Sequence, residues 1–147
     1  MTSEGKAECV VVGVDGSPES ATAMAWAARY AKATGGTIRA VLAWHYPAAI
    51  GSPVGVAPPQ VSSEVGQSKQ GELDSAVDAA LGDSGVHVER KTVYGHAAQV
   101  LIDESKDADL LVVGNRGYGA FAGMLLGSVS THCVAHAACP VTVVRAV

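Results

Sequence analysis

The stretch CVVVGVDGSP, residues 9–18, decides the fold of this 147-residue chain. Its first six residues form a continuous apolar run rich in valine, which is typical of a strand covered on both faces, as in a parallel sheet. The last four residues combine turn chemistry with a helix start, because Ser17 is a good N-cap and Pro18 suits the first helical position. A buried strand that leads directly into a helix predicts an α/β fold.

The rest of the chain continues this alternation of strands and helices. The first helix is expected to end at Gly35 and Gly36, since glycine suits a helix C-cap. Further strands are predicted over 37–44, 86–94, 110–114 and 141–145, and further helices over 64–81, 96–106 and 128–138. Segment 46–63 contains four prolines and is predicted to be a loop.

Regular alternation of strand and helix implies an open, mainly parallel sheet with helices on both faces, the Rossmann-like arrangement. The two most continuous apolar strands, which end at Asp15 and Gly114, are placed next to each other at the centre. Right-handed crossovers then give a five-stranded sheet of order 3-2-1-4-5. With no internal repeat and no linker, residues 1–147 are predicted to form a single domain.

Composition argues against several classes of protein. The formal net charge is −4 and no basic run occurs, so a nucleic-acid-binding protein is not expected. No apolar stretch is long enough to span a bilayer, and residues 1–8 are too polar for a signal peptide. Cys9, Cys133 and Cys139 are odd in number and lack CxxC spacing. They are interpreted as reduced thiols of a cytoplasmic protein.

A glycine-rich loop follows the fourth strand, where a ligand site is expected. Open α/β sheets bind ligands where the winding direction reverses, which here lies between the strands that end at Asp15 and Gly114. From Gly114 the chain reads GNRG, then nine residues, then Gly127 and Ser128. Glycines let the backbone approach a bulky anion, and a helix that begins at Ser128 directs free N–H groups at it. The pattern predicts a phosphate site, to which the hydroxyls of Ser128 and Ser130 add donors.

Three features in and near this loop have two interpretations each. Asp15 either contacts the ligand or forms an Asx-type turn with the residues that follow it. Arg116 either balances phosphate charge or is simply solvated. His132 and His136, four residues apart, superficially resemble a metal site, but no carboxylate or cysteine pair completes a ligand set. No metal ligands are therefore assigned.

Four segments together resemble the universal stress protein family: VGVDGS at 12–17, DLLVVG at 109–114, the glycine loop, and HAACPV at 136–141. The resemblance covers nearly the whole chain, and the loop is similar to that of the family's ATP-binding branch. It implies a fold like that of the adenine nucleotide alpha hydrolases and ATP as ligand, with Mg²⁺ or Mn²⁺ carried by the nucleotide. It also implies a homodimer formed by antiparallel pairing of the last strand, from Val141 to Arg145.

The resemblance also implies roles for individual residues. Asp15 is expected to contact the ribose, and Gly13 to line the adenine pocket. Trp44, bulkier than the aliphatic residue expected at the end of the second strand, is expected to offer backbone groups to the adenine edge. The residues expected along the ribose and phosphates are Gly114, Arg116, Gly117, Gly127, Ser128, Val129 and Ser130.

Three functions are compared on these grounds. The first is an ATP-binding stress regulator or sensor that is at most a slow ATPase, because no Walker lysine follows the glycines and no acid is placed to activate water. The second is an ATP-dependent adenylating enzyme on a related fold. Such enzymes carry a Ser-Gly-Gly-x-Asp-Ser loop, whereas this chain reads GVDGS at 13–17. The third is a nucleotide-free dimerisation module, against which the intact glycine loop argues.

Overall fold

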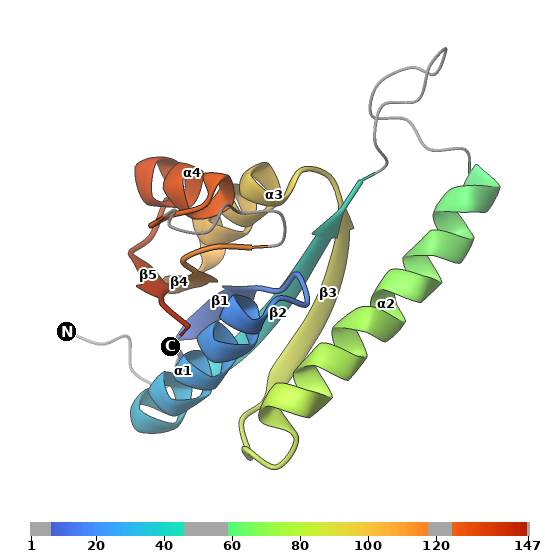
Figure 1. Ribbon diagram of the computed structural model, residues 1–147. Helices are drawn as coiled ribbons and strands as arrows, with labels where there is room; N and C mark the ends of the chain where they lie inside the picture. Colours follow the sequence, from blue (N-terminus) through green and yellow to red (C-terminus); the bar gives the residue numbers. More distant parts are fainter. Residues whose placement is uncertain (1–6, 46–58, 118–124, 147) are drawn as a thin grey trace.

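The computed structural model describes residues 7–45, 59–117 and 125–146, and in these ranges strands and helices alternate as expected (Figure 1). A short 3₁₀ turn, Ser105–Asp107, follows α3. The elements are β1 (Cys9–Gly13), α1 (Pro18–Thr34), β2 (Thr37–Trp44), α2 (Pro59–Leu81), β3 (Val88–Tyr94), α3 (Ala97–Glu104), β4 (Leu110–Gly114), α4 (Ser128–His136) and β5 (Val141–Val144).

The five strands form one sheet of order β3-β2-β1-β4-β5, which confirms the predicted order. Every pairing is parallel. The central strand β1 pairs with β2 on one side and β4 on the other, so that Val12 lies between Ala40 and Val112. The winding direction reverses between β1 and β4, which is the position at which open α/β sheets bind ligands.

Some element boundaries differ from the predicted ones. Helix α2 begins at Pro59. The predicted loop over 46–63 is therefore wrong in its last five residues, because proline is tolerated in the first turn of a helix, where its missing N–H is not needed. The rest of that predicted loop, 46–58, lies outside the described residues. Other ends shift by one to two residues, and α4 ends at His136, before Pro140.

Helix α1 begins and ends as its sequence predicts. The Ser17 hydroxyl oxygen accepts a hydrogen bond from the Ser20 N–H at 3.2 Å, and Pro18 is the first helical residue. Gly35 adopts a left-handed conformation with φ of 73° and donates its N–H to the carbonyl of Ala31. Helix α1 therefore begins shortly after β1 ends. The residues between them lie at the carboxyl end of this central strand.

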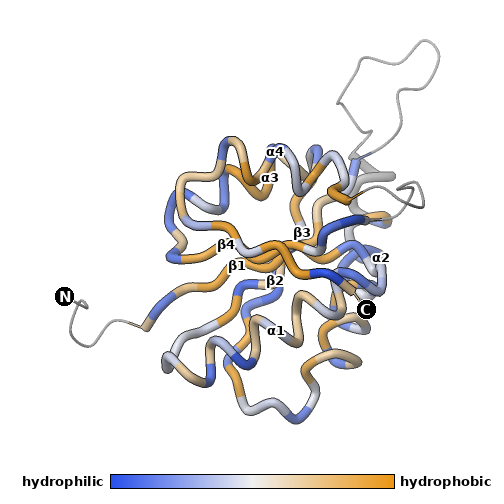
Figure 2. Tube along the Cα trace, turned by 60° about the vertical axis from the view of Figure 1, so that its left-hand side comes forward, coloured by the Kyte–Doolittle hydropathy of each residue, from blue (hydrophilic) through white to orange (hydrophobic). Residues whose placement is uncertain are grey.

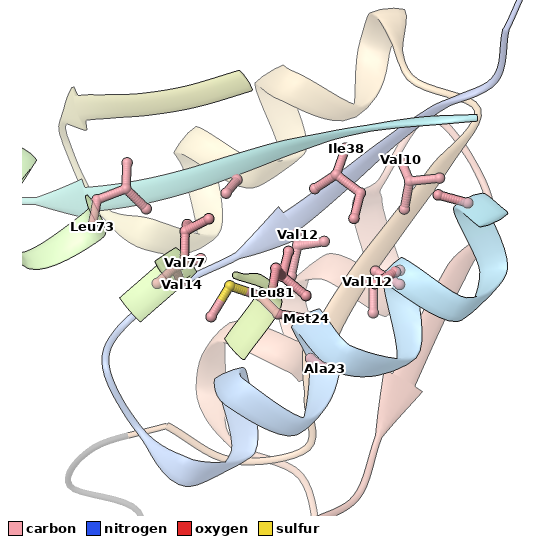
Figure 3. Packing of buried hydrophobic residues seen from close by; sticks show 14 of the residues in the cluster. Val10, Val12, Val14, Ala23, Met24, Ile38, Leu73, Val77, Leu81 and Val112 are labelled. Carbon is pink, nitrogen blue, oxygen red and sulfur yellow. The ribbon is translucent and has the colours of Figure 1, made fainter. Parts of the chain in front are cut away.

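The sheet lies between two helical layers, with α1 and α2 on one face and α3 and α4 on the other (Figures 1 and 2). Because successive strand residues point to opposite faces, Val10 and Val12 pack against α1 and α2, whereas Val11 packs on the other side. Figure 3 shows the first of these clusters, in which Met24 of α1 and Leu73 of α2 meet the strands. Within the described residues, no helix is both long and apolar enough to cross a membrane.

Candidate nucleotide site

A cavity of about 350 Å³ lies at the carboxyl ends of β1, β2 and β4, where the winding reverses. This volume falls within the range of small-molecule sites, about 300–1,000 Å³. Its lining comes from the strand ends, α3 and both ends of the glycine loop. Nine of the ten predicted site residues line it: Gly13, Asp15, Gly114, Arg116, Gly117, Gly127, Ser128, Val129 and Ser130.

One part of the cavity wall is apolar and was not predicted. It is formed by Val41 and Ala43 of β2, Ala97 and Leu101 of α3, and Val113 of β4. Such a wall suits the flat apolar faces of an organic ring. These residues look like ordinary core positions in the sequence. The alternation of side chains along β2 is the one sequence feature that could have indicated part of this wall, because it places Val41 and Ala43 on the same face.

Trp44 is not among the described residues that line the cavity, and the role predicted for its backbone groups stays a prediction. Neighbouring strand residues point to opposite faces, so Ala43 reaches the cavity while Trp44 packs against the cluster beneath α1 and α2. The Trp44 ring meets Tyr94 edge-on, with ring centroids 4.9 Å apart. Its backbone carbonyl accepts a hydrogen bond from the Gly95 N–H at 2.8 Å. Ala43 is therefore the residue of β2 that stands closest to the predicted role.

The two interpretations of Asp15 both describe part of its geometry. Its Oδ1 accepts hydrogen bonds from the backbone N–H of Ser17, at 2.9 Å, and from the Ser17 hydroxyl, which is the Asx-type turn. Its Oδ2 has no hydrogen-bond partner among the described residues. A Cβ atom added to Gly117 would overlap this oxygen, so the glycine loop passes directly beside the carboxylate. One oxygen fixes the turn, and the other remains an acceptor at the cavity.

The glycines of the loop serve different purposes. A Cβ on Gly114 would stand 2.9–3.0 Å from backbone atoms of Glu19, so α1 packs too closely for any side chain there. That glycine is explained by helix packing alone. At Gly127 a Cβ would meet nothing closer than the Arg116 Cα at 3.5 Å, an ordinary contact. Packing in the described residues therefore gives no reason for glycine at this position.

Asn115 joins the two ends of the glycine loop. Its backbone carbonyl accepts hydrogen bonds from the Gly127 N–H at 2.7 Å and the Ser130 hydroxyl at 3.0 Å. Its side-chain amide donates to the Leu125 carbonyl at 3.2 Å, and its N–H donates to the Val144 carbonyl at 2.9 Å. The Ser130 hydroxyl was predicted to be a donor to phosphate. In the structure this hydroxyl is buried and donates to the backbone carbonyls of Asn115 and Gly127.

The N-terminus of α4 faces the cavity without a side-chain cap. Gly127 is the N-cap residue and contributes no capping group, and Ser128, Val129 and Ser130 line the cavity. The first N–H groups of an α-helix have no partner within the helix, and the positive end of its dipole favours an anion. This end of the cavity can therefore bind a phosphate or another anion.

Arg116 is paired with a carboxylate, and its side chain remains 31% exposed. Its Nη2 lies 3.3 Å from Oε2 of Glu19, in the first turn of α1. The Nε of the same guanidinium is buried and has no hydrogen-bond partner. Glu19 was not among the predicted residues, because the contact joins positions almost a hundred residues apart.

The described residues contain no group of three or more side chains that could hold a metal ion. The His132 Nδ1 lies 2.8 Å from the Ser128 carbonyl oxygen, and its ring centroid is 6.4 Å from that of His136. All three cysteines have free thiols. Burial raises the pKa of the Cys133 thiol to about 11, and it raises the pKa values of the Cys9 and Cys139 thiols as well. None of these thiols is activated as a nucleophile.

Comparison with known proteins places this chain in a family. The model of the universal stress protein family matches residues 8–145. A universal stress protein of Mycolicibacterium smegmatis is 37% identical over 142 residues, which cover 92% of this chain and 47% of that protein. The chain spans about half the length of the curated relatives it matches.

Solved structures agree with this result. A universal stress protein in complex with cAMP has a TM-score of 0.69 and 28% identity, over 96% of this chain and 98% of that one. A family member from Arabidopsis thaliana with AMP bound has a TM-score of 0.60, over 94% of this chain and 91% of that one. Its identity is 23%, so that likeness concerns the fold.

Proposed function

Because the chain belongs to the universal stress protein family, we propose that its cavity binds an adenine nucleotide. The base would lie against the apolar wall of Ala43, Ala97 and Leu101, and the ribose hydroxyls would donate to the Asp15 Oδ2. The phosphates would lie on the glycine loop and the N-terminus of α4. The observation that carries this proposal is that one cavity joins an apolar wall, a carboxylate oxygen and a helix N-terminus, and that among the described residues the oxygen has no hydrogen-bond partner and the helix no side-chain cap. The related cAMP complex supports it.

We further propose that the physiological ligand is ATP with Mg²⁺ or Mn²⁺, and that the protein is a cytoplasmic regulator or sensor whose nucleotide state other proteins read. Two observations support binding rather than rapid turnover. The described lining residues include no lysine, and Asp15 is the one acid among them. Rapid phosphoryl transfer relies on positioned cations and a group that orients the attacking nucleophile. At most a slow ATPase is expected.

The ligand can be tested by direct binding. Purified protein is denatured and the supernatant examined for released nucleotide, and the affinity for AMP, cAMP and Mg²⁺–ATP is measured by calorimetry. Gly127→Ala should weaken binding by about tenfold, or ~1.4 kcal/mol, because its Cβ fits the protein but reduces room for the ligand. Gly71→Ala is the matched control, since it adds the same methyl group to open space on α2. Failure of all three nucleotides to bind would contradict the proposal.

We also propose a homodimer through β5, at an edge of the sheet. The carbonyls of Pro140 and Val144 accept hydrogen bonds from Leu111 of β4 and from Asn115, which follows β4, so alternation directs the peptide groups of Val141 and Val143 outward. A free row of such groups is a template for pairing with a second strand. Val143→Pro removes one outward N–H and should give monomers in light scattering, whereas Val143→Thr keeps the N–H and should not. A dimeric proline variant would place the interface elsewhere.

A further inference from the structure

The glycine loop supplies little positive charge for a phosphate site. Between Gly114 and Ser128 the sequence contains a single charged residue, Arg116. The described residues that line the cavity add no second cation. Segments 46–58 and 118–124, which the structure does not describe, contain no charged residue at all. A site for several phosphates would usually have more cationic side chains or a bound metal ion.

The charge of Arg116 is already balanced within the protein. Its guanidinium is 3.3 Å from Glu19, whose side chain is only 14% exposed. The backbone of Glu19 packs directly against Gly114, and the positive end of the α1 dipole stabilises a carboxylate in the first turn. Glu19 is thus held next to the loop. The buried Nε of Arg116, which has no partner, leaves the guanidinium with donor capacity that this pair does not use.

The signs of these charges determine which ligand charges the site can bind favourably. Glu19 and Arg116 form a pair of opposite charges, and Asp15 lies beside Gly117 at the ribose position, so these three side chains give the ribose and phosphate end of the cavity a formal net charge of −1 before any ligand enters. In a partly buried site, charges a few ångströms apart are only partly screened. Each further phosphate on a nucleotide adds negative charge, and the repulsion grows with it. A divalent cation that accompanies the nucleotide would offset that repulsion.

We propose that the Glu19–Arg116 pair sets the phosphate preference of the site, with Glu19 as the specificity-determining residue. The pair favours AMP over metal-free ATP, and admits the triphosphate only together with a divalent cation. This inference rests on the proposed nucleotide site. It goes beyond that site by naming the residue outside the cavity lining that discriminates between nucleotides.

The test compares ligands that differ in charge. Calorimetry measures the affinities of the full chain for adenosine, AMP, ATP with EDTA, and ATP with Mg²⁺. The wild-type protein should bind AMP at least about tenfold more tightly than metal-free ATP at low ionic strength. Adenosine carries no phosphate, so it reports on the base and ribose contacts alone.

Two substitutions should move this ratio in opposite directions. Glu19→Gln keeps the shape of the side chain and makes the phosphate end neutral, so metal-free ATP should gain about tenfold and the effect of Mg²⁺ should shrink. Arg116→Gln should weaken both nucleotides, and metal-free ATP most. Glu19→Gln, whose side chain lies outside the cavity lining, should not alter adenosine binding. The control Glu72→Gln makes the same charge change on α2, where Glu72 pairs with Lys69, and should leave all affinities unchanged.

The outcomes separate this inference from the proposed function. If AMP and ATP bind equally well without metal, or if Glu19→Gln leaves their ratio unchanged, the charge-selection proposal is wrong while nucleotide binding stands. If neither adenosine nor any nucleotide binds, the proposed function fails and this inference fails with it.

Discussion

The two faces of the sheet are covered by helices of very different length, and the ligand cavity lies on the face with the shorter ones. Helix α2 has 23 residues and α1 has 17, and the cluster beneath them includes fully buried Met24, Ile38 and Leu73. On the other face α3 has 8 residues and α4 has 9. The cluster there is smaller and ends in the apolar wall of the cavity.

The same strands serve both faces, so the difference comes from the helices. In β1, Val10 and Val12 contact one cluster while Val11 contacts the other, and all three are fully buried. The face beneath α1 and α2 is closely packed and should contribute most of the stability. The face beneath α3 and α4 contains the cavity and leaves room for a ligand. Stability and ligand affinity should therefore respond to different substitutions, and three experiments examine that separation.

The largest effect is expected at Leu73, on the filled face. Leu73→Ala should lower the free energy of unfolding by about 2–5 kcal/mol, because it leaves a void in a fully buried position. Urea denaturation measures this loss. Leu125→Ala removes the same atoms from a residue that is 76% exposed, and should change stability by less than about 0.5 kcal/mol. Nucleotide affinity of the folded Leu73→Ala protein should equal that of the wild type; a reduced affinity would show that the two faces are coupled.

A smaller effect is expected from Cys133, on the face with the cavity. Burial raises the pKa of its thiol from 9.0 to about 11. The folded protein therefore holds this proton more tightly than the unfolded chain. The stabilising contribution is fully present below pH 9 and is lost as the pH rises to about 11. It amounts to about 2–3 kcal/mol at 1.36 kcal/mol per unit. The difference in unfolding free energy between wild type and Cys133→Ala should shrink over this interval, and a constant difference would contradict the assignment.

The smallest effect is expected from adding two methyl groups on either face of β2. Ala40 is fully buried beneath α1 and α2, so Ala40→Val should overpack that face and cost about 1–3 kcal/mol. Ala43 lines the cavity, so Ala43→Val should leave stability nearly unchanged and weaken nucleotide binding by about tenfold. Thermal denaturation and calorimetry measure the two quantities. If both variants lose stability equally, the two faces are equally well packed.

Local patterns predicted the fold because every signal near β1 and α1 agreed. The valine run, Ser17, Pro18 and Gly35 all act through residues close in sequence, and the strand order followed from where the buried strands ended. Helix α2 was predicted five residues too short, because a proline-rich segment gives the same signal before a helix as inside a loop.

Those parts of the candidate site that glycines and strand ends form could be predicted from the sequence. Those parts that depend on contacts between distant residues could not. Nine of the ten predicted residues line the cavity, since glycines and strand ends mark the crossover in the sequence itself. The side of the sheet on which Ala43 and Trp44 lie could not be predicted, because apolar strands do not reveal which residue faces which layer. Two contacts depend on folded geometry that no sequence spacing specifies. Glu19 pairs with Arg116, and the Ser130 hydroxyl donates to the Asn115 carbonyl within the loop.

Asn115 connects the edge strand β5 to the N-terminus of α4 through hydrogen bonds. Its N–H is bound to Val144, the last residue of the edge strand, and its carbonyl holds Gly127 at the start of α4. A single residue, through its N–H and its C=O, therefore links the end of the edge strand to the start of the helix that faces the cavity. If a second strand docks on β5 as proposed and shifts it, we expect the affinity for the proposed nucleotide to change, and by the reciprocity of coupled equilibria the nucleotide would change the docking affinity by the same factor.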